Sequence, residues 1–146
     1  CNMGKNSGFT LLELLVSVAV VGILVSIAYP SYQQFMVDTN RAGAQRMLLE
    51  VASAENQFWA ANNGRAYVDG SVLFGGGTAC VLGEEPRLVG VPEEAICAVY
   101  TFTAKAELTA IEPPSFELTA TPKDGTIQAG DGLLKIYSNG TKEGPW

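Results

Sequence analysis

The chain opens with a long apolar run and then changes to a mixed pattern. The run Phe9–Tyr29 reads FTLLELLVSVAVVGILVSIAY, and its one charged residue is Glu13. As an α-helix at ~1.5 Å per residue it would span about 30 Å, which matches the hydrocarbon thickness of a bilayer. The run is too long for the apolar region of a secretory signal, and no small-residue cleavage site follows it. We therefore expect a retained transmembrane helix over residues 9–30.

A second helical pattern continues beyond Pro30. Apolar residues recur at helical spacing, while polar residues occupy the other face. The apolar positions are Ala44, Leu48, Val51, Ala52, Phe58 and Trp59. Asn63 and Gly64 supply a stop, because both residue types adopt the left-handed conformation that ends helices. The pattern predicts an amphipathic helix over residues 31–63, with Phe58 and Trp59 packed in the core and not forming a ligand platform.

Residues 64–97 lack sustained periodicity. The segment contains the triplet Gly75-Gly76-Gly77 together with Pro86 and Pro92. Glycine and proline punctuate chains in this way in turns and loops, and loops of this length are commonly functional or disordered. We expect a long connecting loop with an exposed surface, and its residues name no ligand.

Strict alternation appears after Cys97 and predicts three strands within residues 98–146. The alternating apolar residues are Tyr100, Phe102 and Ala104, then Phe116, Leu118 and Ala120, then Leu134 and Ile136. The turn signals between and after them are Pro113-Pro114, Asp124-Gly125, Gly130-Asp131-Gly132 and Asn139-Gly140. An antiparallel meander of this kind has one apolar face, which the amphipathic helix can cover. The fold class is α+β.

Composition argues against nucleic acid and against catalysis. Fifteen acidic and nine basic residues give a net charge of −6, and the basic residues are scattered singly. Direct binding to a phosphate backbone would need a basic patch, so we expect no nucleic-acid partner on charge alone. The chain has no histidine, which removes the usual general base and most zinc sites. No nucleophile, base or cofactor motif is present, so we expect neither an enzyme nor a cofactor.

The polar residues 1–8 determine the expected orientation. They carry one positive charge, Lys5, so by the positive-inside tendency they stay in the cytoplasm and the C-terminal domain lies outside. Because the sequence begins with Cys1, we expect Met3 to be the translation start and Cys1 to have no function. An extracytoplasmic domain is in an oxidising compartment, where Cys80 and Cys97 would pair. Closing a loop of about seventeen residues stabilises a fold by roughly 3 kcal/mol on the chain-entropy model.

Glu13 is the residue that most constrains function. A carboxylate inside the bilayer costs roughly 2.5 to 3.5 kcal/mol on insertion scales unless it is paired, and the apolar run supplies no partner. The ammonium group of a neighbouring chain would serve if that chain were cut between Gly8 and Phe9. The alternative is a tolerated interfacial acid near the helix start.

The string Gly8-Phe9-Thr10-Leu11-Leu12-Glu13, its short basic leader and the membrane-length run resemble type IV pilins and type II secretion pseudopilins. The resemblance implies that a prepilin peptidase cuts after Gly8 and methylates Phe9. It also implies that Glu13 neutralises a neighbour's N-terminus during assembly. The implied partners are other pilin subunits, the peptidase, the inner membrane and the pilus assembly machinery.

The resemblance extends to the helix and the sheet. Gly22 and Pro30 lie where pilin helices carry weak points that unwind locally in filaments. Physically, Pro30 removes a helix hydrogen bond and Gly22 adds backbone freedom, although a simple kink explains them equally well. The sequences at 29–32 and 116–146 resemble PilE-type minor pilins more loosely. The loop from 64 to 95 has no counterpart, and in pilins this segment forms contact surface.

A calcium site is the implication that distinguishes pseudopilins, which hold the ion in a C-terminal loop. Asp124 and Asp131 would be its ligands here. Two carboxylates are too few for a seven-ligand site, and Asp-Gly turns explain both residues without an ion. We therefore expect no metal.

These observations predict a structural subunit, most simply a minor pilin. Residues 1–8 would be a leader, 9–30 the assembly helix and 31–146 the extracytoplasmic domain. The subunit would wait in the inner membrane and then join an extracellular pilus that supports assembly, adhesion, twitching motility or DNA uptake. The alternatives are a type II secretion pseudopilin and a membrane-anchored module that binds a ligand through residues 64–97. The choice between a major and a minor pilin stays open.

Overall fold

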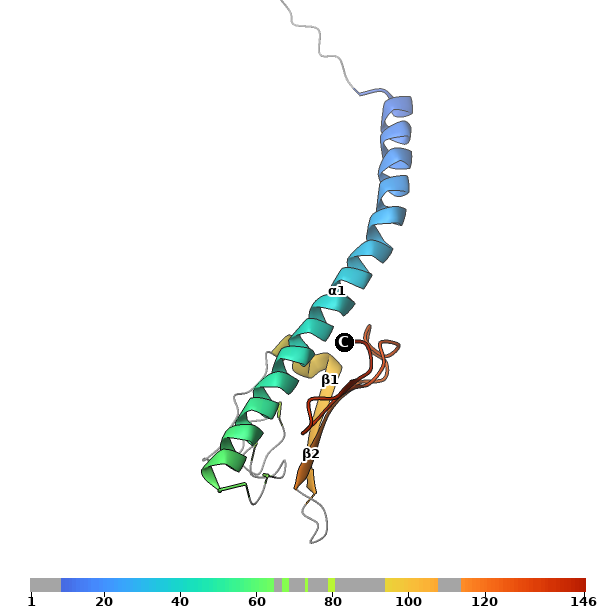
Figure 1. Ribbon diagram of the computed structural model, residues 1–146. Coiled ribbons are helices and arrows are strands. Elements are labelled where there is room, and N and C mark those ends of the chain that lie inside the picture. The colour runs from blue at the N-terminus through green and yellow to red at the C-terminus, as the bar shows by residue number, and fades with distance from the viewer. Residues whose placement is uncertain (1–8, 65–66, 69–72, 74–78, 81–93, 108–113) are drawn as a thin grey trace, which may run out of the picture. The chain divides into compact units, whose positions relative to one another are not determined.

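The computed structural model describes residues 9–64, 67–68, 73, 79–80, 94–107 and 114–146. Within them the helices and strands follow one another as a long helix, a short helix and four strands (Figure 1). The elements are α1 (Leu11–Ala61), α3 (Glu94–Val99), β1 (Tyr100–Glu107), β2 (Ser115–Pro122), β3 (Leu134–Tyr137) and β4 (Lys142–Glu143). The chain divides into two compact units, Cys1–Met36 and Val37–Trp146.

The first unit is the N-terminal part of α1. The hydroxyl of Thr10 accepts a hydrogen bond from the backbone N–H of Glu13 at 3.2 Å, which caps the helix start. Two serines inside the apolar segment bond to their own helix. Ser17 Oγ donates to the Glu13 carbonyl and Ser26 Oγ to the Ile23 carbonyl, both at 2.7 Å. These hydroxyls therefore need no water, as an apolar environment requires.

The second unit contains a four-stranded antiparallel sheet in the order β1-β2-β3-β4. The expected meander and its three strands are confirmed, and the α+β fold class with them. Phe102 pairs with Ala120, and Ala120 with Leu134, so the buried residues of neighbouring strands share one face. The fourth strand, β4, was missed because two residues, Lys142 and Glu143, are too short to show alternation.

The second part of α1 supplies the apolar stripe that packs on this face. Ala44 is completely buried, and Leu48 and Val51 are each 2% exposed, in one cluster with Tyr100 and Leu118. The expectation that an amphipathic helix covers the sheet is confirmed.

The aromatic pair at the end of α1 divides between core and edge. Phe58 packs against the core, whereas Trp59 is 39% exposed and stacks on Tyr67 with ring centroids 6.2 Å apart. The core prediction is thus correct for Phe58 and wrong for Trp59. α1 ends at Ala61, and Asn63 and Gly64 take positive φ, as the stop signal predicted.

Residues 94–97 are helical, although the sequence predicted loop there. α3 packs its buried Ile96 against Gly43 of α1, where any Cβ would overlap the isoleucine side chain. Cys97 in the same helix forms the expected disulfide with Cys80. A short helix with one buried residue leaves too little periodicity to detect. Most of the expected loop, residues 64–97, lies outside the described residues.

The C-terminal residues fold back onto the sheet. The indole N–H of Trp146 donates to the carbonyls of Lys135, at 3.1 Å, and Glu143, at 2.9 Å. Gly144 makes this return possible, because its φ is +98° and a Cβ there would overlap the Leu133 carbonyl oxygen. Only glycine fits this position without strain.

We predict that Gly144→Ala lowers the free energy of unfolding by at least about 2 kcal/mol, because it combines positive φ with a backbone clash. Urea denaturation of the full-length protein in detergent micelles, followed by tryptophan fluorescence, measures this loss. Gly130→Ala is the matched control, since a Cβ at Gly130 meets nothing within 4 Å. Equal stability of the two variants would contradict the prediction.

Candidate functional site

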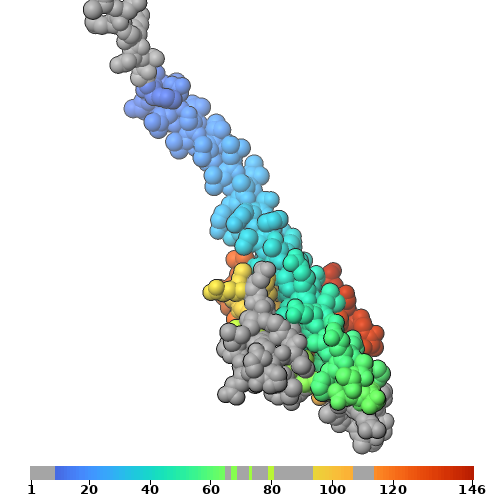
Figure 2. Space-filling model, turned by 90° about the vertical axis from the view of Figure 1, so that its left-hand side faces the viewer, coloured from blue at the N-terminus to red at the C-terminus, as the bar shows by residue number. Residues whose placement is uncertain are grey.

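The first candidate site is the apolar surface of the first unit. Between Leu11 and Ile27 the large apolar side chains are 50% to 84% exposed, and Figure 2 shows them projecting along the blue segment. The segment has a mean hydropathy of 2.6 and is long and apolar enough to cross a membrane. A contiguous apolar surface of this size is unstable in water and calls for lipid or other helices around it.

Glu13 is the one carboxylate on this surface. It lies in the first turn of α1 and is exposed, and within the described residues it forms no ion pair. Phe9 is 80% exposed just ahead of it, while Gly8 lies outside the described residues. A counter-charge for the Glu13 carboxylate would therefore have to come from outside the described residues.

The two expected weak points both lie inside continuous helix. Gly22 has nothing within 4 Å of where a Cβ would be, and Pro30 lies within α1 without ending it. Their unwinding in a filament stays a prediction.

A buried polar cluster joins three elements of the second unit. We call it the Asp131 cluster, and it consists of Asn40 and Arg41 on α1, Tyr100 on β1, and Gln128 and Asp131 between β2 and β3. Arg41 binds both oxygens of the Asp131 carboxylate, with Nε 3.0 Å from Oδ2. The Tyr100 hydroxyl donates to Oδ2 at 2.7 Å and the Gln128 amide at 2.6 Å.

The cluster also reaches the backbone of α1. The Gln128 amide nitrogen donates to the Val37 carbonyl at 3.2 Å, and its oxygen accepts from Asn40 at 3.4 Å. The side chain of Asp131 is 1% exposed and Gln128 is completely buried. Because buried polar groups are costly unless bonded, this cluster fixes one position of the 123–133 connection against the helix.

The electrostatics of the cluster follow from its contacts. Burial alone would raise the pKa of Asp131, but hydrogen bonds from Arg41, Tyr100 and Gln128 hold that pKa below its usual value. Burial, followed by the hydrogen bond to Asp131, raises the pKa of the Tyr100 hydroxyl well above its ordinary range. Asp131 is thus a carboxylate and Tyr100 a neutral phenol at neutral pH.

The calcium interpretation does not fit this arrangement. The Asp131 carboxylate is occupied by three protein donors, and Asp124 is exposed in the turn after β2. Among the described residues no group of three His, Cys, Asp or Glu side chains could hold a metal ion. The sequence indicated Asp131 as a turn residue or a calcium ligand, and no local pattern links it to Arg41, so their pairing was missed.

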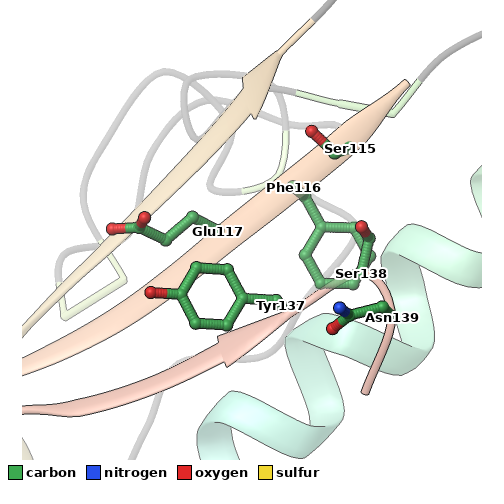
Figure 3. Close-up of a pocket in the computed structure, with 6 residues that line it drawn as sticks. All are labelled: Ser115, Phe116, Glu117, Tyr137, Ser138 and Asn139. Atoms are coloured by element: carbon green, nitrogen blue, oxygen red, sulfur yellow. The ribbon is translucent and has the colours of Figure 1, made fainter. Parts of the chain in front are cut away.

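Strands β2 and β3 carry an ion pair and border a pocket. Lys135 Nζ lies 3.0 Å from Glu117 Oε1, and the hydrogen bond to Lys135 lowers the pKa of Glu117. Figure 3 shows the Glu117 and Tyr137 side chains extending in the same direction from paired positions of β2 and β3. The pocket, about 230 Å³, is lined by Ser115, Phe116, Glu117, Tyr137, Ser138 and Asn139. These groups can hydrogen-bond a polar molecule, but they form no recognisable catalytic set.

Two family models match the chain. One, described as "Type IV minor pilin ComP, DNA uptake sequence receptor", matches residues 30–132. The other, the "Prokaryotic N-terminal methylation motif", matches residues 3–29. Together they cover residues 3–132, which include Glu13 and every residue of the Asp131 cluster but not β3 or β4.

Individual proteins give the same picture. The chain is 31% identical over 99 residues to fimbrial protein EcpC of Eikenella corrodens, covering 58% of this chain and 65% of that protein. It is 28% identical over 106 residues to a fimbrial protein of Moraxella nonliquefaciens, covering 67% and 66%. It is also 48% identical over 48 residues to a probable minor fimbrial protein of Dichelobacter nodosus, covering 33% and 28%.

The chain thus spans just under two thirds of the length of the first two of these relatives. No solved structure matches the chain.

We predict that Asp131→Asn lowers the free energy of unfolding by about 3 kcal/mol near neutral pH, because it leaves Arg41 without its buried counter-charge. Since the folded pKa of Asp131 is below the unfolded value of about 3.9, its ionic contribution is present above that pH and is lost as pH falls through the folded pKa. Denaturant titrations of the full-length protein across acid pH measure both effects.

The exposed Asp124→Asn is the matched control and should change stability by no more than about 0.5 kcal/mol. The wild type should lose its advantage over Asp131→Asn as the pH falls. A constant difference between them down to strongly acid pH would show that Asp131 does not contribute as a carboxylate.

Proposed function

The chain belongs to the family of the type IV minor pilin ComP, and from that premise we propose that it is a structural subunit of a type IV pilus. Two relatives are named fimbrial proteins, and a methylation motif covers residues 3–29. In the proposed sequence of events a prepilin peptidase removes residues 1–8 and methylates Phe9. The subunit is then held in the inner membrane until it enters the filament.

The observation that carries the proposal is the exposed apolar helix with Glu13 in its first turn. Apolar side chains on all faces of one helix suit a bilayer, and they suit the centre of a helical filament equally well. A trimmed neighbour would offer its N-terminal ammonium as the counter-charge. An acid that forms no ion pair among the described residues would thereby favour addition of a second subunit.

The rival functions draw less support from the described residues. A type II secretion pseudopilin would be favoured by a calcium site, yet Asp131 is committed to Arg41, Tyr100 and Gln128. A ligand-binding module on a membrane tether would place its site in residues 64–97, and most of these lie outside the described residues. Such a module would have no use for the acid at Glu13.

We predict that Glu13→Gln lowers the amount of this subunit in sheared surface filaments at least about tenfold, while its amount in the membrane fraction stays the same. The substitution keeps the shape of the side chain and removes the charge that a neighbour's ammonium would meet. Immunoblots of the two fractions from the native host give the ratio.

Ser17→Ala, one turn further along, is the matched control, because Ser17 bonds only within its own helix in the described structure. Mass spectrometry of the membrane-held protein must show methylated Phe9 as the first residue in wild type and in both variants. That result separates assembly from processing. Normal filament incorporation of Glu13→Gln, or an intact leader in working wild-type subunits, would refute the proposal.

A second candidate function is a receptor for DNA, and the description of the matching family favours it. The charges of the chain argue against DNA binding. The net charge is −6, and Arg41 and Lys135 are committed to Asp131 and Glu117. Lys105 and Lys123 are exposed, but they lie at opposite ends of the paired strands β1 and β2.

The DNA candidate makes a separate prediction. Fluorescence anisotropy with labelled duplexes should show tighter binding to fragments of the host's own genome than to shuffled duplexes of the same composition. Phosphate contacts should also make that binding weaken between about 50 mM and 200 mM salt. Lys105→Ala with Lys123→Ala should weaken it further, with Lys135→Ala as the paired-lysine control. Equal, weak binding to both duplexes would leave the charge argument standing and reject the receptor.

A further inference from the structure

The last two turns of the first unit differ in composition from the apolar segment before them. Residues 29–35 read YPSYQQF, in which aromatic and polar residues mix, whereas aliphatic residues dominate before Tyr29. Tyr29, Tyr32 and Phe35 are 62%, 63% and 65% exposed. We define these three residues as the aromatic collar. The proposed pilus function assigns no role to it.

The collar lies at the distance from the helix start at which a bilayer ends. From Leu11 to Tyr29 the helix rises about 27 Å, and to Tyr32 about 32 Å, at ~1.5 Å per residue. The hydrocarbon core is about 30 Å thick. With the N-terminal end at one face of the membrane, the two tyrosines fall at the other face.

The geometry of the collar suits an interface better than a core. At about 100° per residue the three rings fall within roughly 120° of arc, so they form one side of the helix and not a complete belt. The Tyr29 hydroxyl accepts a hydrogen bond from the Gln33 side chain at 2.9 Å, which leaves its proton for another acceptor. A tyrosine places its apolar ring at the acyl boundary and its hydroxyl among headgroups.

The polar residues of the same turns agree with this environment. Ser31, Gln33 and Gln34 would be expensive in hydrocarbon, and all three are exposed. Pro30 deprives the Ser26 carbonyl of its helical donor, a loss that water at a membrane surface can make good. One position along the helix axis thus accommodates both the aromatic rings and the polar groups.

We propose that the aromatic collar binds the phospholipid headgroup region at the extracytoplasmic face and fixes the depth of the helix before assembly. The partner is the lipid interface itself, with ester carbonyls and phosphates as acceptors for the tyrosine hydroxyls. The proposal rests on the proposed function only in requiring that the helix spans the membrane.

The test uses tryptophan as a depth probe in the full-length protein. Tyr32→Trp is reconstituted in phosphatidylethanolamine and phosphatidylglycerol vesicles, whose lipids are brominated either near the headgroup or near the chain end. Trp59 and Trp146 contribute background fluorescence, which is measured in the wild-type protein and subtracted. We expect the added signal to be quenched at least about twofold more by headgroup-proximal than by chain-end bromine. Val21→Trp, in the middle of the segment, should show the opposite order.

The outcomes distinguish failure of the membrane-spanning helix from failure of the aromatic collar. Absence of quenching for Val21→Trp by either lipid would mean that the helix does not span, which removes the anchor itself. A second outcome would refute the collar alone. In it, chain-end bromine quenches Val21→Trp, while Tyr32→Trp is either unquenched or also quenched more by chain-end than by headgroup-proximal bromine.

A depth measurement completes the test. In the Val21→Trp background, Tyr29→Ala with Tyr32→Ala should shift the ratio of the two quenching signals at least about twofold. Tyr29→Phe with Tyr32→Phe is the conservative variant, because it keeps the rings and removes the hydroxyls. It should shift the quenching ratio less than the double alanine variant. Gln33→Ala is the matched polar control and should leave the ratio unchanged. An unchanged ratio in the double alanine variant, even with reduced filament incorporation, would assign the tyrosines to subunit packing and overturn the proposal.

Discussion

The exposed apolar surface of the N-terminal helix is the constraint on which the remaining features depend. Large side chains from Leu11 to Ile27 are unfavourable in water at these exposures, and the described residues of the first unit do not cover them. The cover has to be lipid or other helices. Because the serine hydroxyls inside the segment bond to their own backbone, neither environment meets an unsatisfied hydroxyl there. Membrane retention and filament packing therefore follow from one surface.

The two acids Glu13 and Asp131 show how differently the units treat charge. Asp131 is buried, and Arg41, Tyr100 and Gln128 all donate to it. Glu13 is exposed on an apolar surface, and within the described residues its carboxylate forms no ion pair. A carboxylate satisfied by its own domain stabilises that domain. A carboxylate that awaits a charge from outside makes assembly more favourable than isolation.

The elements that the sequence predicts are those with sustained periodicity. The apolar run, the stripe containing Leu48 and Val51, and the alternation through Phe102 and Leu118 all appeared in the fold. What escaped prediction is short or depends on residues distant in sequence. β4 and α3 are too brief to show a period, and Arg41 meets Asp131 across a separation of 90 positions in the sequence. An aspartate between two glycines indicates a turn equally well whether its carboxylate is solvated or buried.

The same reasoning explains why assembly can be controlled by few residues. Lipid tails are about as apolar as the leucines of neighbouring helices, so moving the segment from bilayer to filament changes the hydrophobic free energy little. Small polar terms then decide the balance. In the two proposals made above, Glu13 acts at one end, where pairing with an ammonium would favour the filament, and the tyrosines act at the other, where headgroups would favour the membrane. Between these ends the serine hydroxyls distinguish the two environments little, since Ser17 and Ser26 already bond to backbone carbonyls of their own helix.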